Sequence, residues 1–196
     1  MHAMKWSSLD VDHFLQATRD VAPMILAERD AIERSRGLSP ELVGFLCDAG
    51  LFSLWLPRSL GGPELTVADF VRVIEAIARI DGSAGWCTAI GACLSRLAGY
   101  LTPSIADEIY GAGNAILAGT LNPTGRAIAV TGGYRVTGQW SYGSGIGHSN
   151  WVVGNCLVFD GDMQQKNLDG SPVIKLIIVP KGDVEVLDTW HQGNRT

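Results

Sequence analysis

The chain has 196 residues, 46% of them hydrophobic, so it can bury a sizeable core in one large domain or two small ones. Its formal net charge of −5 excludes the basic footprint of a protein that binds nucleic acid or anionic lipid. The first residues, MHAMKWSSLDVDHF, lack the apolar segment of a signal peptide, and no uncharged apolar run is long enough to span a membrane. We therefore expect a cytoplasmic protein without nucleic-acid or membrane partners.

The four cysteines, at positions 47, 87, 93 and 156, show no C-x-x-C spacing and lie among apolar or small residues. This pattern predicts reduced, buried thiols rather than disulfides or zinc ligands. The four histidines are scattered along the chain. We therefore expect no metal site.

Helical periodicity dominates the first hundred residues. Between residues 10 and 36, apolar residues interleave with charges, which predicts one or two amphipathic helices with a break or kink at Pro23. The serine–proline pair at 39–40 predicts the start of the next helix, because serine caps a helix and proline suits its first turn. Gly50 predicts the end of that helix.

Three more helices are predicted before residue 112. Thr66 and Asp69 form a capping-box-like start, and the apolar stripe that follows predicts an amphipathic helix. A more apolar helix is predicted over about 84–101, and its few charges suggest burial. A short helix follows over about 102–111.

From Ala115 onward the pattern becomes that of strands. Six strand-like segments, AILAGTL, AIAV, YRVTGQW, NWVVGNCLVF, VIKLIIVP and VEVL, are separated by Asn-Pro, Gly-Gly and Asp-Gly turn signals. Helices followed by strands predict an α+β fold rather than alternating βαβ units. We expect a helical domain over 1–113 and a β-domain over 114–196.

The glycine-rich segment 143–147, GSGIG, lies between Trp140 and Trp151. It does not fit a dinucleotide-binding loop, because its third glycine comes one residue early and strand-like residues follow it. It does not fit a nucleophile elbow either, because Tyr142 stands where that motif needs glycine. Two interpretations stay open: a close backbone approach to a flat polar ligand, or an elaborate turn between strands.

Larger blocks resemble the acyl-CoA dehydrogenase superfamily. The block AGLFSLWLPRSLGGPELTVADFVRVIEAIARIDGSAGW (49–86) resembles its N-terminal helical domain, including a helix that ends in A-R-x-D-x-S. The segments GTLNPTGRA (119–127) and GGYRVTGQWSYGSG (132–145) resemble its middle β-domain. The resemblance covers nearly the whole chain. It implies an N-terminal all-α helical domain followed by an antiparallel β-barrel-like domain.

The resemblance also implies a flavin site, in which the strand that carries G-x-W lines the isoalloxazine ring. Glycine lets the backbone approach the ring, and serine supplies a small hydrogen-bonding hydroxyl. The implied cofactor-binding residues are Thr120, Asn122, Trp140, Tyr142, Gly143, Ser144 and Gly145. Ser144 is implied as the catalytic group near flavin N5, and Trp86 as a wall of the substrate site. The alternatives stay open that Trp140 is a core aromatic, that Ser144 caps its own turn, and that Trp86 packs between helices.

The spacing of eleven between Trp140 and Trp151, with W-S-Y-G-S-G and His148 between them, resembles the W-x-F-x-S-G…H-x-x-W pattern of the flavin-dependent monooxygenase branch. GSAGW (82–86) resembles that branch as well. The dehydrogenase pattern TEPxxGSD is kept only loosely, because TLNPTGRA lacks the acidic residue after glycine. The resemblance implies hydroxylation of an aromatic compound, with FAD or FMN supplied reduced by a separate flavin reductase.

Two other functions stay open: a true acyl-CoA dehydrogenase that uses FAD and an acyl-CoA substrate, and a truncated, non-catalytic remnant of the family. The final residues, VLDTWHQGNRT, resemble the family stretch DTWxxxGMRGTGS and stop inside it. We expect the family's C-terminal four-helix bundle, which carries the catalytic base, to be absent, and we assign no base. Surfaces left open in this way predict a homo-oligomer.

Overall fold

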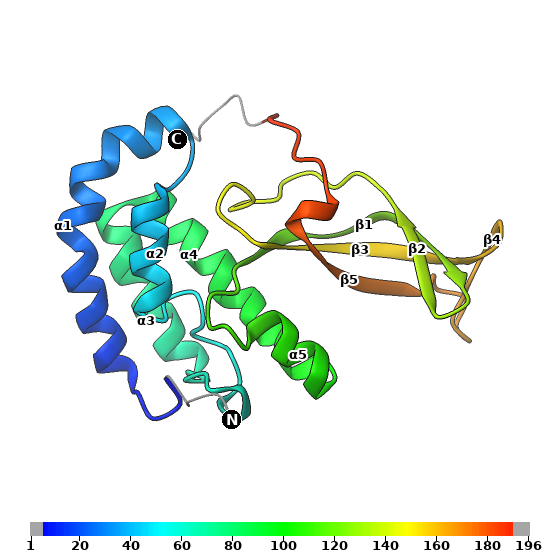
Figure 1. Ribbon diagram of the computed structural model, residues 1–196, viewed down its shortest axis with the longest axis horizontal. Coiled ribbons are helices and arrows are strands. Elements are labelled where there is room, and N and C mark those ends of the chain that lie inside the picture. The colour runs from blue at the N-terminus through cyan, green and yellow to red at the C-terminus, as the bar shows by residue number, and fades with distance from the viewer. Residues whose placement is uncertain (1–5, 190–196) are drawn as a thin grey trace.

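The computed structural model describes residues 6–189 of the chain. Figure 1 shows the α-helices gathered at one side of the molecule and a sheet that extends away from them. The predicted α+β order, helices first and strands afterwards, is confirmed. No helix within residues 6–189 is long and apolar enough to cross a membrane.

The helical part contains α1 (Val11–Ser35), α2 (Pro40–Asp48), α3 (Val67–Ile80), α4 (Gly82–Leu94) and α5 (Pro103–Tyr110). Three short 3-10 helices are η1 (Arg58–Leu60), η2 (Ser95–Tyr100) and, after the sheet, η3 (Lys181–Asp183). The first four α-helices begin where a short polar side chain accepts a hydrogen bond from a backbone N–H of the first turn, which satisfies a donor that the helix cannot. These caps are Asp10, Ser39, Thr66 and Asp81.

Of the two alternatives for residues 10–36, one helix or two, the structure shows one, because α1 runs through Pro23. The helix expected over 84–101 ends as an α-helix at Leu94 and continues as the tighter η2. The change of helix type lies within an apolar stretch, where periodicity carries little information because most side chains are small or apolar.

The main hydrophobic core lies among α1 to α4 and the segment between α2 and α3. Phe14, Ile25, Leu42, Phe52 and Ile77 are among its large, fully buried side chains. They come from three helices and a connecting segment, so burial of these side chains holds the helical part together.

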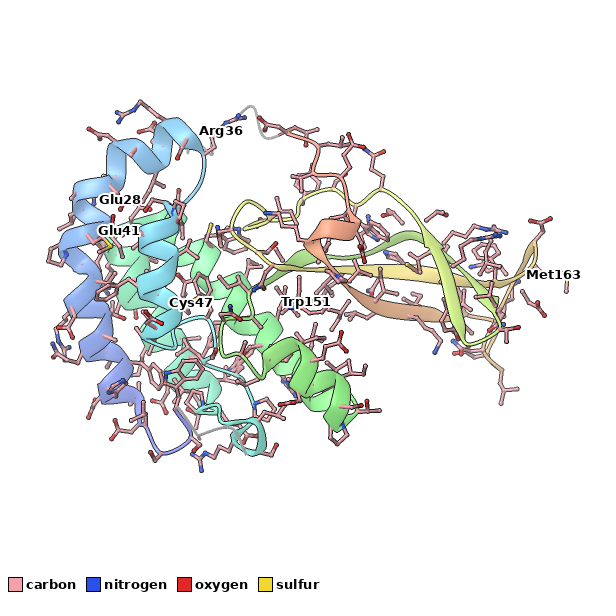
Figure 2. All side chains as sticks on the ribbon, viewed as in Figure 1. Glu28, Arg36, Glu41, Cys47, Trp151 and Met163 are labelled. Carbon is pink, nitrogen blue, oxygen red and sulfur yellow. The ribbon has the colours of Figure 1, made fainter. Side chains whose placement is uncertain are left out.

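A second, smaller core joins the helical part to the sheet. Ile109 and Tyr110 of α5, together with Leu56, form one cluster with Leu117 and Val153 of the two central strands. Figure 2 labels Trp151, which lies where the sheet meets the helices and packs on this cluster. Because both central strands start at this cluster, it sets where the sheet leaves the helical part.

The sheet contains β1 (Leu117–Val130), β2 (Gly133–Thr137), β3 (Trp151–Asp160), β4 (Met163–Gln164) and β5 (Ile174–Pro180). β1 pairs with β2 in antiparallel and with β3 in parallel orientation. β3 also pairs with β4 and β5, both antiparallel. β1 and β3 are therefore the central strands, and β2 and β5 flank them.

The sheet differs from the expected antiparallel, barrel-like arrangement in two respects: it is mixed, and it is open. The chain forms a hairpin with β2 and then crosses back through residues 138–150, so β3 starts beside the start of β1 and runs parallel to it. The segment 184–187, expected as a strand, is not one. The α-helices end at Tyr110 and the strands begin at Leu117, while the division into domains 1–113 and 114–196 stays a prediction.

α3 and α4 approach each other closely at Gly85, where a Cβ atom would lie 2.6 Å from both Cα and Cβ of Ala78. Gly85→Ala should therefore force the two helices apart and lower the free energy of unfolding by about 1–3 kcal/mol. Gly82→Ala, on the same helix, is the matched control because a Cβ there meets nothing within 4 Å. Urea unfolding measures both variants, and equal stabilities would contradict this account of the helix contact.

Candidate functional site

Trp140 lies on the sheet above a floor of glycines. A Cβ atom on Gly154 of β3 would lie 2.7 Å from Cε2 of its ring, and one on Gly138 would lie 2.9 Å from Cη2. A Cβ on Gly125 of β1 would collide with the same ring. The indole Nε1 donates a hydrogen bond to the Asn155 carbonyl oxygen at 2.9 Å. The half-buried ring is thus held in one position, which only glycine at these sites permits.

A four-residue bulge in β1, residues 121–124, lies beside this ring. The pairing of β1 with β3 shifts register between Thr120 and Gly125, so these residues leave the ladder. The Thr124 hydroxyl donates to the Gln139 carbonyl at 2.8 Å, and Asn155 Nδ2 donates to the Leu121 carbonyl at 2.6 Å. The bulge is therefore tied both to the segment before Trp140 and to β3.

Residues 142–149, here called the Ser144 turn, form a compact non-helical turn. Backbone N–H groups of Ser144, Ile146 and His148 donate to the carbonyls of Tyr142, Gly143 and Gly145, respectively, at 2.9, 3.0 and 3.2 Å. Gly145 has φ +81°, which suits glycine, but Tyr142 has φ +63°, which is rare for a bulky residue. The Tyr142 side chain is also 81% exposed. The backbone thus holds a large aromatic ring toward solvent in a strained conformation.

The end of the Ser144 turn is fixed by the two residues Asn150 and Lys181. The Asn150 side chain accepts a hydrogen bond from Ile116 N–H at 2.8 Å and donates one to the Asn114 carbonyl at 2.9 Å. Lys181 Nζ donates to the Gly147 carbonyl at 2.8 Å, and its backbone N–H donates to the Asn150 carbonyl. The turn is therefore anchored to the entry of β1 and to the chain that leaves β5.

His148 lies beneath the turn, with its ring 5.8 Å from that of Phe52. Burial, and after it the positive charge of Lys181, lowers the pKa of His148 to about 4, so the imidazole is neutral at pH 7. Its Nε2 is buried and has no hydrogen-bond partner within residues 6–189.

The structure brings most of the expected site residues into one region. Thr120 and Asn122 lie at the bulge, Trp140 lies on the glycine floor, and the Ser144 turn follows directly. The residues gathered in this way are Thr120, Asn122, Trp140, Tyr142, Gly143, Ser144 and Gly145. The half-buried Ser144 hydroxyl has no partner in the described part of the chain, so the alternative that it caps its own turn is not observed.

Trp86 stands apart from this group. It lies in the first turns of α4 and its side chain is 57% exposed, so it does not pack between helices. Within residues 6–189, no three His, Cys, Asp or Glu side chains come together as a metal site would require. The sequence interpretation also missed Gly154, Asn155 and Lys181, although a glycine inside a strand is a known signal of close approach.

Known proteins share this arrangement of helices and sheet. Residues 10–102 match the family model of the acyl-CoA dehydrogenase N-terminal domain. The flavin-dependent monooxygenase oxygenase subunit HsaA of Mycobacterium tuberculosis is 28% identical over 185 residues, which are 93% of this chain and 45% of that protein. A pigment production hydroxylase of a Rhodococcus species is 31% identical over 176 residues, which are 87% of this chain and 43% of that protein.

A solved structure of XiaF from a Streptomyces species, in complex with FADH2 and glycerol, matches this fold with a TM-score of 0.82 at 29% identity. The match covers 93% of this chain and 45% of XiaF, so the chain spans less than half the length of these relatives. The shared helical domain, the shared sheet and these similarities together show an acyl-CoA dehydrogenase-like fold, similar to that of flavin-dependent monooxygenases.

Proposed function

We propose that this chain contributes the flavin-contacting region of an oxygenase component that hydroxylates a small aromatic compound. The observation that carries the proposal is the partnerless Ser144 hydroxyl, presented on a tight glycine turn that follows a fixed tryptophan ring four residues earlier in the chain. The names of the relatives, an oxygenase subunit and a hydroxylase, support the same reaction class. They give no support to the acyl-CoA dehydrogenase alternative.

The residues of this region fit a flat, polar cofactor such as FAD or FMN. Trp140 offers a ring whose position the glycine floor fixes, and the glycines of the Ser144 turn allow close backbone approach. Ser144 offers one hydrogen-bond donor that the protein itself leaves unused. When bound, a reduced flavin supplies the electrons that activate oxygen for transfer to the substrate.

The chemical contribution of the chain is then positional and electrostatic. The Ser144 hydroxyl would donate a hydrogen bond to the bound flavin ring, from a turn that is already formed. A donor fixed in this way stabilises developing charge without the reorganisation that water would need. Trp86, exposed on α4, is our candidate for a wall of the aromatic substrate site.

We also propose that a separate reductase supplies the reduced flavin. The term "oxygenase subunit" in the name of HsaA implies a companion component, and XiaF was solved with FADH2. The four cysteines form no disulfide with one another, which suits the reducing cytoplasm as the location of the chain.

Ser144→Ala should weaken the binding of reduced FMN or FAD several-fold, because one hydrogen bond to the ring contributes about 1 kcal/mol. Anaerobic titration of both flavins measures the dissociation constants. Ser59→Ala is the matched control, since Ser59 is an exposed serine on η1 in the helical part. Unchanged affinity in Ser144→Ala would remove Ser144 from the site. Absence of flavin binding in the wild-type chain would contradict the proposed function and favour the alternative of a non-catalytic remnant of the family.

Gly154→Ala tests the glycine floor. A Cβ at this position would displace the Trp140 ring, so we expect flavin affinity to fall by more than in Ser144→Ala, with a stability loss of about 1–3 kcal/mol. Gly133→Ala, in β2, is the control because a Cβ there meets nothing within 4 Å. The same titration and a thermal melt distinguish lost binding from lost folding. Wild-type affinity in a folded Gly154→Ala protein would show that the ring position does not matter for binding.

We further propose that the chain forms a homo-oligomer through the outer half of its sheet. Ile174 and Leu176 alternate along β5 on one face and are 46% and 37% exposed, and Val130 of β1 is 48% exposed. The outer edge of β5 pairs with no strand within residues 6–189. Exposed apolar side chains beside an open strand edge favour association with another chain.

Sedimentation velocity at low micromolar concentration should show a dimer or a larger species. Leu176→Lys should shift this species toward monomer, because a charge would be buried in the interface. Leu26→Lys on α1 replaces a similarly exposed leucine far from β5 in the chain and should leave the oligomer intact. A monomeric wild-type protein, or equal effects of the two substitutions, would contradict this interface.

A further inference from the structure

The Ser144 turn touches the helical core through His148 and Phe52. Phe52 is 1% exposed and belongs to the main hydrophobic core. It is pressed against α4, since a Cβ on Gly91 would lie 2.6 Å from its Cδ1 atom. Phe52 is therefore a fixed surface, and the imidazole of His148 lies against it with an interplanar angle of 39°.

The imidazole also lies against the turn that carries it. A Cβ on Gly145 would lie 3.2 Å from His148 Nε2 and 3.4 Å from Cε1, so the backbone of the turn closes directly over the ring. The buried Nε2 has no hydrogen-bond partner within the described residues. The imidazole thus fills the space between the turn and Phe52 as a packing element, and its polar atom is left without compensation.

The surroundings of this ring oppose a positive charge. Lys181 on η3 donates to the Gly147 carbonyl, so an ammonium group is fixed on the same turn. Phe52, whose ring lies 5.8 Å from the imidazole, is apolar. Of the charged groups in the described part of the chain, Lys181 is the one that acts on His148, and together with burial it lowers the pKa of the imidazole.

We propose that His148 is a positioning residue, whose uncharged ring supports the Ser144 turn against Phe52 and whose protonation releases that turn from the helical part. The inference rests on the proposed function only where it links the turn to flavin binding. The packing of His148 between Phe52 and Gly145 is independent of any ligand.

The direction of the pH dependence follows from the two states of the turn. In the released turn His148 is hydrated and takes its ordinary pKa of 6.5, whereas in the closed turn the pKa is about 4. The released turn therefore binds more protons between these values, so lowering the pH from 6.5 toward 4 favours release. At pH 5 the opening equilibrium should be about 30-fold larger than at pH 8.

Amide hydrogen exchange of the full chain tests this directly. We expect the protection of residues 143–149, corrected for intrinsic exchange, to fall about 30-fold between pH 8 and pH 5 in the wild type. His148→Phe keeps a ring against Phe52 and cannot be protonated, so its turn should stay protected at both pH values. His148→Ala removes the support, so its turn should exchange fast at both.

His13→Phe, at an exposed position on α1, should behave as the wild type does. Amides of α1 report global unfolding, so a variant that fails to fold can be recognised. If a variant does fail to fold, the pH dependence of protection in the wild type alone tests the proposal. A wild-type turn whose protection does not change with pH, or a folded His148→Ala protein whose turn stays protected, would overturn the proposal.

Titration with reduced FMN at pH 8 and pH 5 adds the functional link. The wild type should lose affinity at pH 5 by a factor similar to its loss of protection, and His148→Phe should lose less. Equal losses in both proteins would overturn the link between the turn and the ligand. If neither protein binds FMN at any pH, the proposed function fails, and the exchange result still decides the role of His148.

Discussion

The contact between the Trp140 ring and its glycine floor is the constraint on which the candidate site depends. Gly125 and Gly154 lie on the two central strands, so the ring can rest on the sheet only if β1 and β3 are adjacent there. That pairing requires the chain to cross back after β2, and the crossing segment carries both Trp140 and the Ser144 turn. The sheet topology therefore determines the position of the site.

The helical part contributes a fixed base for this arrangement. The cluster around Leu56, Tyr110, Leu117 and Val153 holds the first residues of both central strands, and Asn150 ties the crossing segment to the entry of β1. The candidate site thus stands on elements whose positions are set by burial and by backbone hydrogen bonds. Rigid support of this kind is what keeps a hydrogen-bond donor in place before a ligand arrives.

The sequence predicted most of the helices, because their caps and apolar stripes are local signals, as at Ser39 and Thr66. It did not predict the parallel pairing of β1 and β3, which depends on how a long connection folds. The grouping of Trp140 with Ser144 came from family motifs. The glycine floor was missed because Gly125 and Gly154 are far apart in the chain and become neighbours only through strand pairing.

Tyr142 shows what a preformed turn implies for an exposed side chain. Its left-handed backbone costs on the order of 1–2 kcal/mol, and this cost is met when the chain folds, not when a ligand arrives. Because the backbone of the turn is fixed, the Cα–Cβ bond of Tyr142 points in one direction, and its ring is exposed to solvent. Moving the ring onto a different backbone path would require the hydrogen bonds that form the turn to break.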